Sequence, residues 1–337
     1  MQTITLKAHA KINPSLDVLA KRPDGYHDVR LIMQLIELHD LVILEWRKAP
    51  AGTAPDTENA ALPFRIRLYC DDPSVPCDAH NLAWKAAAGL AAAMKEKGRE
   101  VPRGELTIRI EKHIPMAAGL AGGSADGAAV LLGCNALWGA GFDLAELLAA
   151  GARLGADVPF AVMGAARVNE VLGMADDPLA AACALGEGTG TKITVLPPVD
   201  AHLLLVKPPI GVSTKDAYEG IDAILGYGAA GEASSAVPDP AAKRPDIDAV
   251  VLALNKHDLF SARSKMGNTL ELYTLKRYHE VAYTKCKIQE CIENGVALMS
   301  GSGPTVFLIA PEAEEVRRAY HALQGMDAQV ILTRTIV

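Results

Sequence analysis

The chain has 337 residues, half of them apolar, and a net charge of −7, which predicts a soluble protein with a sizeable core. The acidic balance argues against a nucleic-acid surface, because binding to phosphate backbones needs clustered Lys and Arg. The sequence has no run of about 18 apolar residues, and its N-terminus resembles neither a signal peptide nor a transit peptide, so we expect a cytoplasmic protein. The six cysteines lack CxxC spacing, which favours free thiols over a metal or disulfide site.

The first half of the chain mixes strand and helix patterns. Residues 29–46 predict two strands with a polar break at His39-Asp40, and RPDGYHD (22–28) carries an Asp-Gly turn signal. Further strands are predicted over residues 3–19, 64–70 and, as an edge strand, 106–114, with a loop over 48–62. Helices are predicted from Asn81 to Gly98, from Ser124 to Trp138 and over 142–155.

The second half predicts strands over 199–209 and 328–336, helices over 247–264, 271–293 and 312–324, and a strand–turn–strand over 295–310. A Gly/Ala/Pro-rich insert at 226–246 predicts a mobile surface loop. We place a domain boundary near residue 160 and allow for some exchange of segments, which gives an N-terminal domain over 1–160 and a C-terminal domain over 161–337.

The stretch IPMAAGLAGGSADGAAVLLGCN (114–135) is rich in glycine and ends in an apolar helical pattern. It has no lysine, which excludes a Walker loop, and its glycine spacing is not that of a Rossmann fingerprint. The N-terminus of a helix after glycines, with Ser124 at the N-cap, can bind an anion. Asp126 in the first turn weakens that reading slightly. From these residues alone, a phosphate cradle and a plain capped turn are about equally supported.

Five blocks occur together in one order and carry a resemblance. They are AKINPSLDVLAKRPDGYHDVRLIMQLIELHD (10–40), PMAAGLAGGSADGAAVLL (115–132), LGADVPF (154–160), GVSTKDAY (211–218) and SGSGPTVFLI (300–309). Together they resemble the galactokinase, homoserine kinase, mevalonate kinase and phosphomevalonate kinase (GHMP kinase) superfamily. AKIN followed by RPDGYH resembles its branch of 4-diphosphocytidyl-2-C-methyl-D-erythritol kinases, and GNTLE (267–271) is a weaker echo of that branch.

The resemblance implies an α+β two-domain fold. Its N-terminal half would be similar to the second domain of ribosomal protein S5, its C-terminal half would be ferredoxin-like, and the active site would lie in the cleft between them. It also implies ATP-dependent phosphorylation of the 2-hydroxyl of 4-diphosphocytidyl-2-C-methyl-D-erythritol, in non-mevalonate isoprenoid biosynthesis. Such an enzyme would bind its small-molecule substrate and ATP, and neither nucleic acid nor membrane; the oligomeric state is not predicted.

Asp157 and Lys11 are the catalytic residues that the resemblance implies, as general base and its partner. The chemistry agrees, because phosphoryl transfer to an alcohol needs a carboxylate near the hydroxyl and cations near the phosphoryl group. Outside these motifs, the same Asp is typical of a helix cap and the same Lys of a solvated strand charge.

On the substrate side the resemblance implies Asn13, Tyr26 and His27, with Tyr218 as a second stacking residue. Aromatic and imidazole rings beside an Asp-Gly turn can stack on a cytosine and bind its edge. The structural alternatives are a strand cap for Asn13, a turn-packing Tyr26, a solvated His27 and a core-edge Tyr218.

For ATP, the resemblance implies a triphosphate cradle and purine- or ribose-side contacts. The cradle residues are Pro115, Gly119, Leu120, Ala121, Gly122, Gly123 and Ser124, and the contacts are Asn81, Lys112 and Asn135. The structural alternatives for these contacts are a helix cap for Asn81, a solvated strand charge for Lys112 and a helix-interior polar group for Asn135. Mg²⁺ should accompany ATP, with Ser124 as a candidate ligand. Gly301, Ser302 and Gly303 resemble the third family motif. Ala121 replaces a usual glycine, and its methyl group is strained if φ is positive.

Three alternative functions follow from the same residues. A sister GHMP-type alcohol kinase is disfavoured by RPDGYH, and a non-catalytic metabolite-binding relative is disfavoured by the presence of both Lys11 and Asp157. A ribosome- or nucleic-acid-associated module is disfavoured by the acidic balance.

Overall fold

The structure is a computed structural model, and it describes residues 1–50, 62–227 and 244–337. Most of the predicted loop 48–62 and of the predicted insert 226–246 lies outside the described residues. The six cysteines all lie among the described residues and are free thiols, as predicted.

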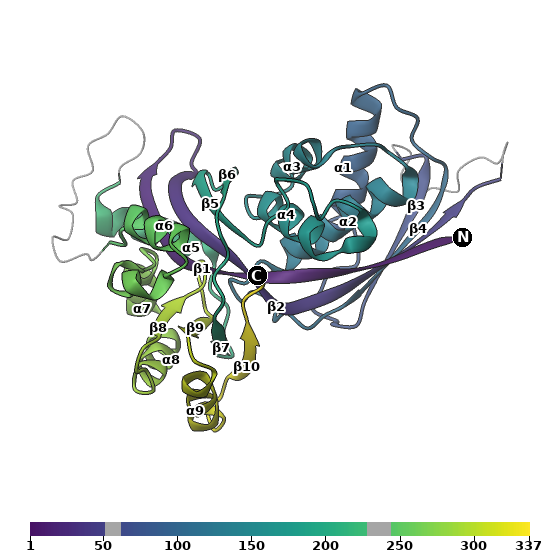
Figure 1. Cartoon of the computed structure of the whole chain (residues 1–337). Coiled ribbons are helices and arrows are strands. Elements are labelled where there is room, and N and C mark those ends of the chain that lie inside the picture. The colour runs from purple at the N-terminus through teal and green to yellow at the C-terminus, as the bar shows by residue number, and fades with distance from the viewer. Residues whose placement is uncertain (51–61, 228–243) are drawn as a thin grey trace. The chain divides into compact units, whose positions relative to one another are not determined.

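The chain forms two compact units whose segments alternate along the sequence (Figure 1). Unit 1 comprises Met1–Ala10, Leu38–Ile114 and Ala121–Ala181; unit 2 comprises Lys11–Glu37, Pro115–Leu120 and Ala182–Val337. Two long strands, β1 (Gln2–Lys21) and β2 (His27–Lys48), run through both units. These units exchange segments, which the sequence analysis allowed for, and the domain bounds 1–160 and 161–337 stay a prediction.

Unit 1 places helices against one face of a sheet. β4 (Gly104–Glu111) lies between β3 (Phe64–Cys70), which is parallel to it, and the antiparallel second half of β2. Leu106, Ile108 and Ile110 of β4 are buried, so its alternation reflects one covered face, and the prediction of an edge strand was wrong. The helices on that face are α1 (Leu82–Glu96), α2 (Gly122–Trp138), α3 (Leu144–Ala152) and α4 (Val158–Val168), followed by the 3₁₀ turn η1 (Glu170–Leu172) (Figure 1).

Helix α2 is buried at every residue from Ala125 to Asn135, and its small residues allow this. A Cβ atom on Gly133 would lie 2.4 Å from Leu44 Cδ1, so the helix backbone packs directly on the side chains of β2. The Gly/Ala content of the stretch therefore sets how deeply α2 sits in the core of unit 1.

Unit 2 contains the first half of β2, which pairs with β5 (Cys183–Gly188), and β6 (Lys192–Val195), which pairs with β5. A second, antiparallel sheet has the order β10-β7-β9-β8. Its strands are β7 (His202–Lys207), β8 (Val296–Met299), β9 (Val306–Ala310) and β10 (Gln329–Arg334). The helical elements are α5 (Thr214–Leu225), α6 (Ile247–Asn255), η2 (Leu259–Lys265), α7 (Glu271–Arg277), α8 (His279–Gln289) and α9 (Ala313–Leu323).

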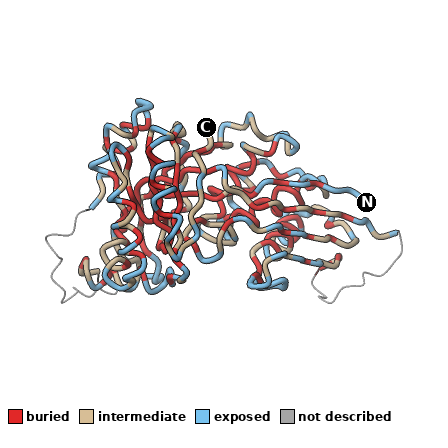
Figure 2. Tube along the Cα trace, turned by 90° about the horizontal axis from the view of Figure 1, so that it is seen from below, coloured by how far each residue is buried: buried red, intermediate tan, exposed pale blue. Residues whose placement is uncertain are grey.

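Buried residues gather along the strands, and exposed residues lie at turns and on outward helix faces (Figure 2). Every residue of β9 is buried, which matches its continuous apolar sequence. The strand predicted over 199–209 is confirmed as β7, the strand–turn–strand over 295–310 as β8 and β9, and the strand over 328–336 as β10.

Three predicted elements have different boundaries. β2 is continuous through His39-Asp40, so the predicted break was wrong. The helix predicted over 271–293 is two helices, because Tyr278 has an extended backbone (φ −118°, ψ 98°). The helix predicted over 247–264 ends at Asn255, shortly before His257 takes φ +54°, and continues as η2.

Candidate functional site

Lys11 lies on β1 in unit 2 and is only 5% exposed. Its ammonium donates to Asn13 Oδ1 over 2.8 Å. Its backbone N–H donates to Leu120 O over 3.1 Å, which ties the strand to residues 115–124, called the glycine segment below. Lys11 is therefore not a solvated strand charge, and its position beside the glycine segment suits a functional cation.

Asn13 is fully buried, and both polar atoms of its side chain bind other groups of unit 2. Oδ1 also accepts from Gly301 N over 3.1 Å, and Nδ2 donates to Ile32 O over 3.2 Å. These bonds hold the Lys11 ammonium and the turn after β8 in fixed positions. A direct contact of Asn13 with substrate stays a prediction.

The Gly/Ser turn at residues 300–303 contacts Gly119, in the part of the glycine segment that belongs to unit 2. Ser300 Oγ donates to Gly119 O over 2.9 Å. A Cβ atom on Gly119, whose φ is +73°, would lie 2.2 Å from Ser300 O. No other residue type fits so close an approach, so the glycine at this position is a geometric requirement. Ser302 Oγ lies 3.1 Å from Thr214 Oγ1, which links the same turn to the start of α5.

Helix α2 begins two residues earlier than predicted, at Gly122, and its N-cap is Ala121 with φ +59°. The prediction of Ser124 as N-cap was wrong, because the chain turns at Ala121. Ala125 N donates the first bond of the helix, to Ala121 O, so the N–H groups of Gly122, Gly123 and Ser124 precede the ladder. Since no side chain caps this end, the dipole and these N–H groups suit an anion.

Lys112 follows β4 and joins two carboxylates in unit 1. Its side chain is 3% exposed; its ammonium contacts the Asp40 carboxylate and lies 2.9 Å from Asp126 Oδ2. Burial lowers the pKa of Lys112, but Asp126 and Asp40 more than offset this, and the pKa lies above its ordinary value. Burial raises the pKa of Asp126 against the opposing effect of Lys112. Asp126 therefore does not serve as a first-turn charge on the helix dipole, which corrects the sequence prediction.

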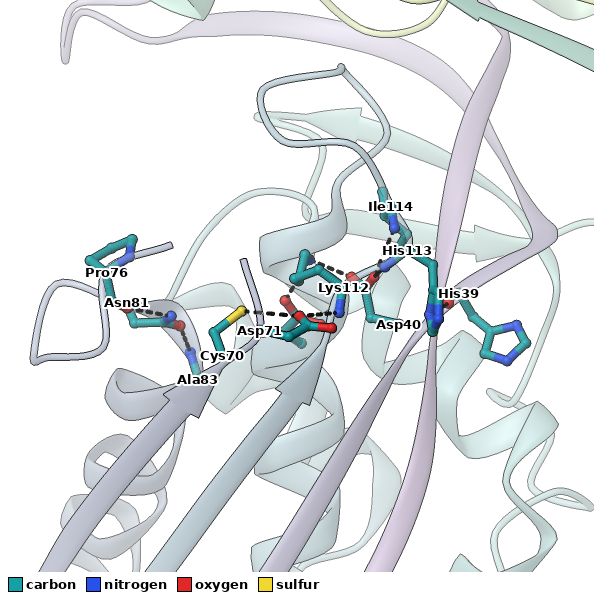
Figure 3. Close-up of polar contacts among 11 residues, drawn as sticks. His39, Asp40, Cys70, Asp71, Pro76, Asn81, Ala83, Lys112, His113 and Ile114 are labelled. Carbon is teal, nitrogen blue, oxygen red and sulfur yellow. Dashed lines mark hydrogen bonds and ion pairs between the residues drawn. The ribbon is translucent and has the colours of Figure 1, made fainter. Parts of the chain in front are cut away.

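Asp40 is the member of this cluster that sequence reasoning missed. It is fully buried, and its Oδ1 accepts from His113 N over 2.6 Å and from Ile114 N over 2.8 Å (Figure 3). The available signal was a charged residue inside an otherwise apolar strand, since a buried charge needs partners.

Asn81 and Asn135 have the structural contacts expected of such residues outside a motif. Asn81 caps α1, because its Oδ1 accepts from Ala83 N over 2.8 Å and its Nδ2 donates to Pro76 O (Figure 3). Asn135 exchanges two hydrogen bonds with the backbone of Phe142. Their contacts with ATP, and that of the half-buried Pro115, stay predictions.

Asp157 lies at the N-cap position of α4 in unit 1, before Val158 and Pro159. Its side chain makes no capping hydrogen bond, and the residue is half-buried. The alternative that this Asp serves as a helix cap is therefore excluded, and its role as a base stays a prediction.

His27 is buried in unit 2 and binds a carboxylate that the sequence did not point to. Its Nε2 lies 2.6 Å from Asp222 Oδ1, and Lys21 Nζ lies 2.7 Å from Asp222 Oδ2. The ring of Tyr218 lies 5.0 Å from the imidazole at 38°. Tyr26, in the adjoining turn, is 67% exposed. His27 is thus not a solvated turn residue, and two aromatic groups lie close to it in space or in sequence.

Comparison with known proteins gives the family. The chain matches the GHMP kinases N terminal domain over residues 81–165 and the GHMP kinases C terminal domain over 250–328. It is 38% identical over 338 residues to the 4-diphosphocytidyl-2-C-methyl-D-erythritol kinase of Acetivibrio thermocellus, covering 100% of both chains. It is 39% identical over 335 residues to the kinase of that name from Pelotomaculum thermopropionicum, covering 98% of each. The chain belongs to the 4-diphosphocytidyl-2-C-methyl-D-erythritol kinase family.

The fold agrees with this family. A crystal structure of 4-(cytidine 5'-diphospho)-2C-methyl-D-erythritol kinase matches with a TM-score of 0.67 and 25% identity, covering 98% of this chain and 99% of that one. The predicted α+β two-domain GHMP kinase fold is confirmed, and the chain is an ATP-dependent small-molecule kinase of the 4-diphosphocytidyl-2-C-methyl-D-erythritol kinase family.

Two further observations bear on this kinase. Among the described residues, no group of three or more His, Cys, Asp or Glu side chains could hold a metal ion. Within those same residues, no helix is long and apolar enough to cross a membrane.

Proposed function

We propose that the chain transfers the γ-phosphoryl group of ATP to the 2-hydroxyl of 4-diphosphocytidyl-2-C-methyl-D-erythritol, in isoprenoid precursor biosynthesis. The observation that carries this proposal is 38% identity over the whole length of both chains to a curated kinase of that name. The residues of each unit then support individual parts of the reaction.

The nucleotide phosphates bind to the start of α2 in this proposal. The helix end has no side-chain cap, and its leading N–H groups can donate to phosphate oxygens. Backbone donors and a helix dipole replace the lysine of a Walker loop. Lys11 supplies a cation that stabilises charge on the transferring phosphoryl group.

Asp157 acts as the general base. It accepts the proton of the substrate hydroxyl as the new O–P bond forms and the bond to the ADP leaving group breaks. Its half-buried position at the start of α4 is compatible with this role.

The cytosine binds at His27, between Tyr26 and Tyr218. In the neutral tautomer that donates from Nε2 to Asp222, which also binds Lys21, the Nδ1 atom of His27 is a hydrogen-bond acceptor. An acceptor fits the exocyclic amine of cytosine and disfavours the carbonyl that uracil has at the same position. The two tyrosine rings supply stacking surface.

Mg²⁺ would bind with ATP. Mg²⁺ is commonly held by one or two protein groups together with phosphates and water. The lack of a cluster of metal-binding side chains among the described residues fits an ion that takes most of its ligands from the nucleotide, with the Ser124 hydroxyl as a protein ligand. A cytoplasmic location completes the proposal and rests on the sequence alone.

Asp157→Asn tests the proposal. We expect the variant to fold normally and to lose about 10²–10⁴-fold in kcat, with little change in KM. Asp143→Asn, at the N-cap of α3 in the same unit, is the matched control and should keep full activity. Near-normal turnover by Asp157→Asn would reject Asp157 as the base.

A further inference from the structure

The Lys112 cluster consists of Asp40, Lys112 and Asp126, all in unit 1, and it joins the residues just before the glycine segment to the helix just after it. Lys112 lies just before the segment, and Asp126 lies in the second turn of α2, just after it. The side chains of Asp40, Lys112 and Asp126 are 0%, 3% and 4% exposed. The contacts of the ammonium are therefore with protein groups and not with solvent.

On the entry side, two carboxylates bind consecutive backbone N–H groups. Asp71 accepts from Lys112 N over 2.9 Å, and Asp40 accepts from the next two N–H groups, those of His113 and Ile114 (Figure 3). Charge-assisted bonds of this kind fix the direction in which the chain leaves β4.

On the exit side, the ammonium lies beside the first turn of α2. A Cβ atom on Gly122 would lie 3.3 Å from Lys112 Nζ. The bond to Asp126 Oδ2 then ties the same ammonium to the helix itself. One side chain therefore bridges the entry of the segment and the helix whose leading N–H groups would bind phosphate.

The cluster is not expected to stabilise the core of unit 1 better than apolar side chains would. Asp126 Oδ1 is buried, and among the described residues it has no hydrogen-bond partner. Buried ion pairs often stabilise a protein no better than well-packed apolar residues, and an unsatisfied oxygen adds a cost. Such a cluster is better explained by the position that it imposes on the chain.

We propose that Lys112, Asp40 and Asp126 are positioning residues of the phosphate site: they hold the entry of the glycine segment and the start of α2 in the geometry that binds the triphosphate. This rests on the proposed binding of ATP at α2. It is an alternative to the predicted purine- or ribose-side contact of Lys112, and it is supported by the two buried carboxylates that the ammonium contacts.

Asp126→Asn is the direct test, because it removes the negative charge from the Lys112 contact with α2 and keeps the Lys112–Asp40 pair. The dissociation constant for ATP and the inhibition constant of adenosine are measured on the folded variant, together with the KM of the cytidyl substrate. We expect ATP to bind about tenfold more weakly, with adenosine and the cytidyl substrate unchanged. Asp143→Asn in the same unit is the control, with all three constants unchanged.

Two results would overturn the proposal. One is a folded Asp126→Asn that binds ATP as the unaltered chain does. The other is an equal weakening of ATP and adenosine, which would assign the cluster to the nucleoside. Asp126→Ala serves if the first variant does not fold, and the ratio of the two constants is read in the same way. Failure of the unaltered chain to bind ATP would instead reject the proposed function.

Discussion

A cluster of ionisable groups around Lys112 lies in unit 1 and another around Asp222 lies in unit 2, and the two have opposite compositions. In unit 1, two carboxylates share the Lys112 ammonium. In unit 2, the Asp222 carboxylate is shared by the ammonium of Lys21 and the imidazole of His27. The first cluster binds backbone N–H groups and so sets the position of the main chain; the second orients a ring.

The clusters also differ in burial. The Lys112 side chain is 3% exposed, whereas that of Lys21 is 27% exposed. A buried charge loses more when its partner is removed, because solvent cannot replace the partner. The comparison therefore predicts that the unit 1 cluster matters for stability and nucleotide binding, and the unit 2 cluster for substrate recognition.

The largest effect should come from Lys112→Met compared with Lys21→Met. Lys112→Met leaves two buried carboxylates without their cation and should cost about 3–5 kcal/mol of unfolding free energy. Lys21→Met should cost less than about 1 kcal/mol, because Lys21 is partly exposed and Asp222 keeps His27 as a partner. Urea denaturation of both variants measures the difference. Equal losses would break the comparison.

Asp222→Asn should act on substrate alone. Without the carboxylate, the His27 ring loses its fixed orientation, and we expect about a tenfold fall in kcat/KM for the cytidyl substrate. The KM for ATP should not change, which is the opposite pattern to Asp126→Asn. Asp216→Asn on α5 carries the same chemical change at an exposed position and is the control. A rise in the KM for ATP with Asp222→Asn would remove the proposed division between the clusters.

Ala121→Gly should have the smallest effect and the opposite sign. Ala121 has φ +59°, a conformation that costs a residue with a Cβ atom about 1–2 kcal/mol. Relief of this strain, less the entropy that glycine adds to the unfolded chain, should stabilise the protein by about 1 kcal/mol or less. Ala125→Gly, within α2, should destabilise it instead. A loss of stability with Ala121→Gly would mean that this strain is absent.

The sequence predicted the strands, most helices and the residue types of the site, because these depend on local periodicity and on ordered motifs. The Gly/Ser turn between β8 and β9 and the N-cap role of Asn81 are examples, since a turn and a helix start each restrict the residues that fit. Lys11 was singled out from its motif and Lys112 from the family resemblance, although their partners could not be read from the sequence.

The parts that were missed depend on contacts far apart in the chain. Asp40 binds residues more than 70 positions away, and His27 binds Asp222 across 195 positions. Asp40 was interpreted as part of a strand break. His27 was assigned to the substrate side, with a solvated side chain as the alternative, and its partner Asp222 could not be read from the sequence. An exchange of segments was allowed for, but the exchanged residues could not be named from the sequence, since β1 and β2 run on through both units and no composition change marks the crossing.

ADP release in the presence of ATP and Mg²⁺ tests the central claim most directly, with 4-diphosphocytidyl-2-C-methyl-D-erythritol as one acceptor and the same polyol without its cytidine as the other. The proposed cytosine site predicts turnover of the cytidyl substrate and a rate at least about 100-fold lower without the base. Equal rates with both acceptors would contradict the cytosine site, and no ADP release with either would contradict the proposed kinase activity.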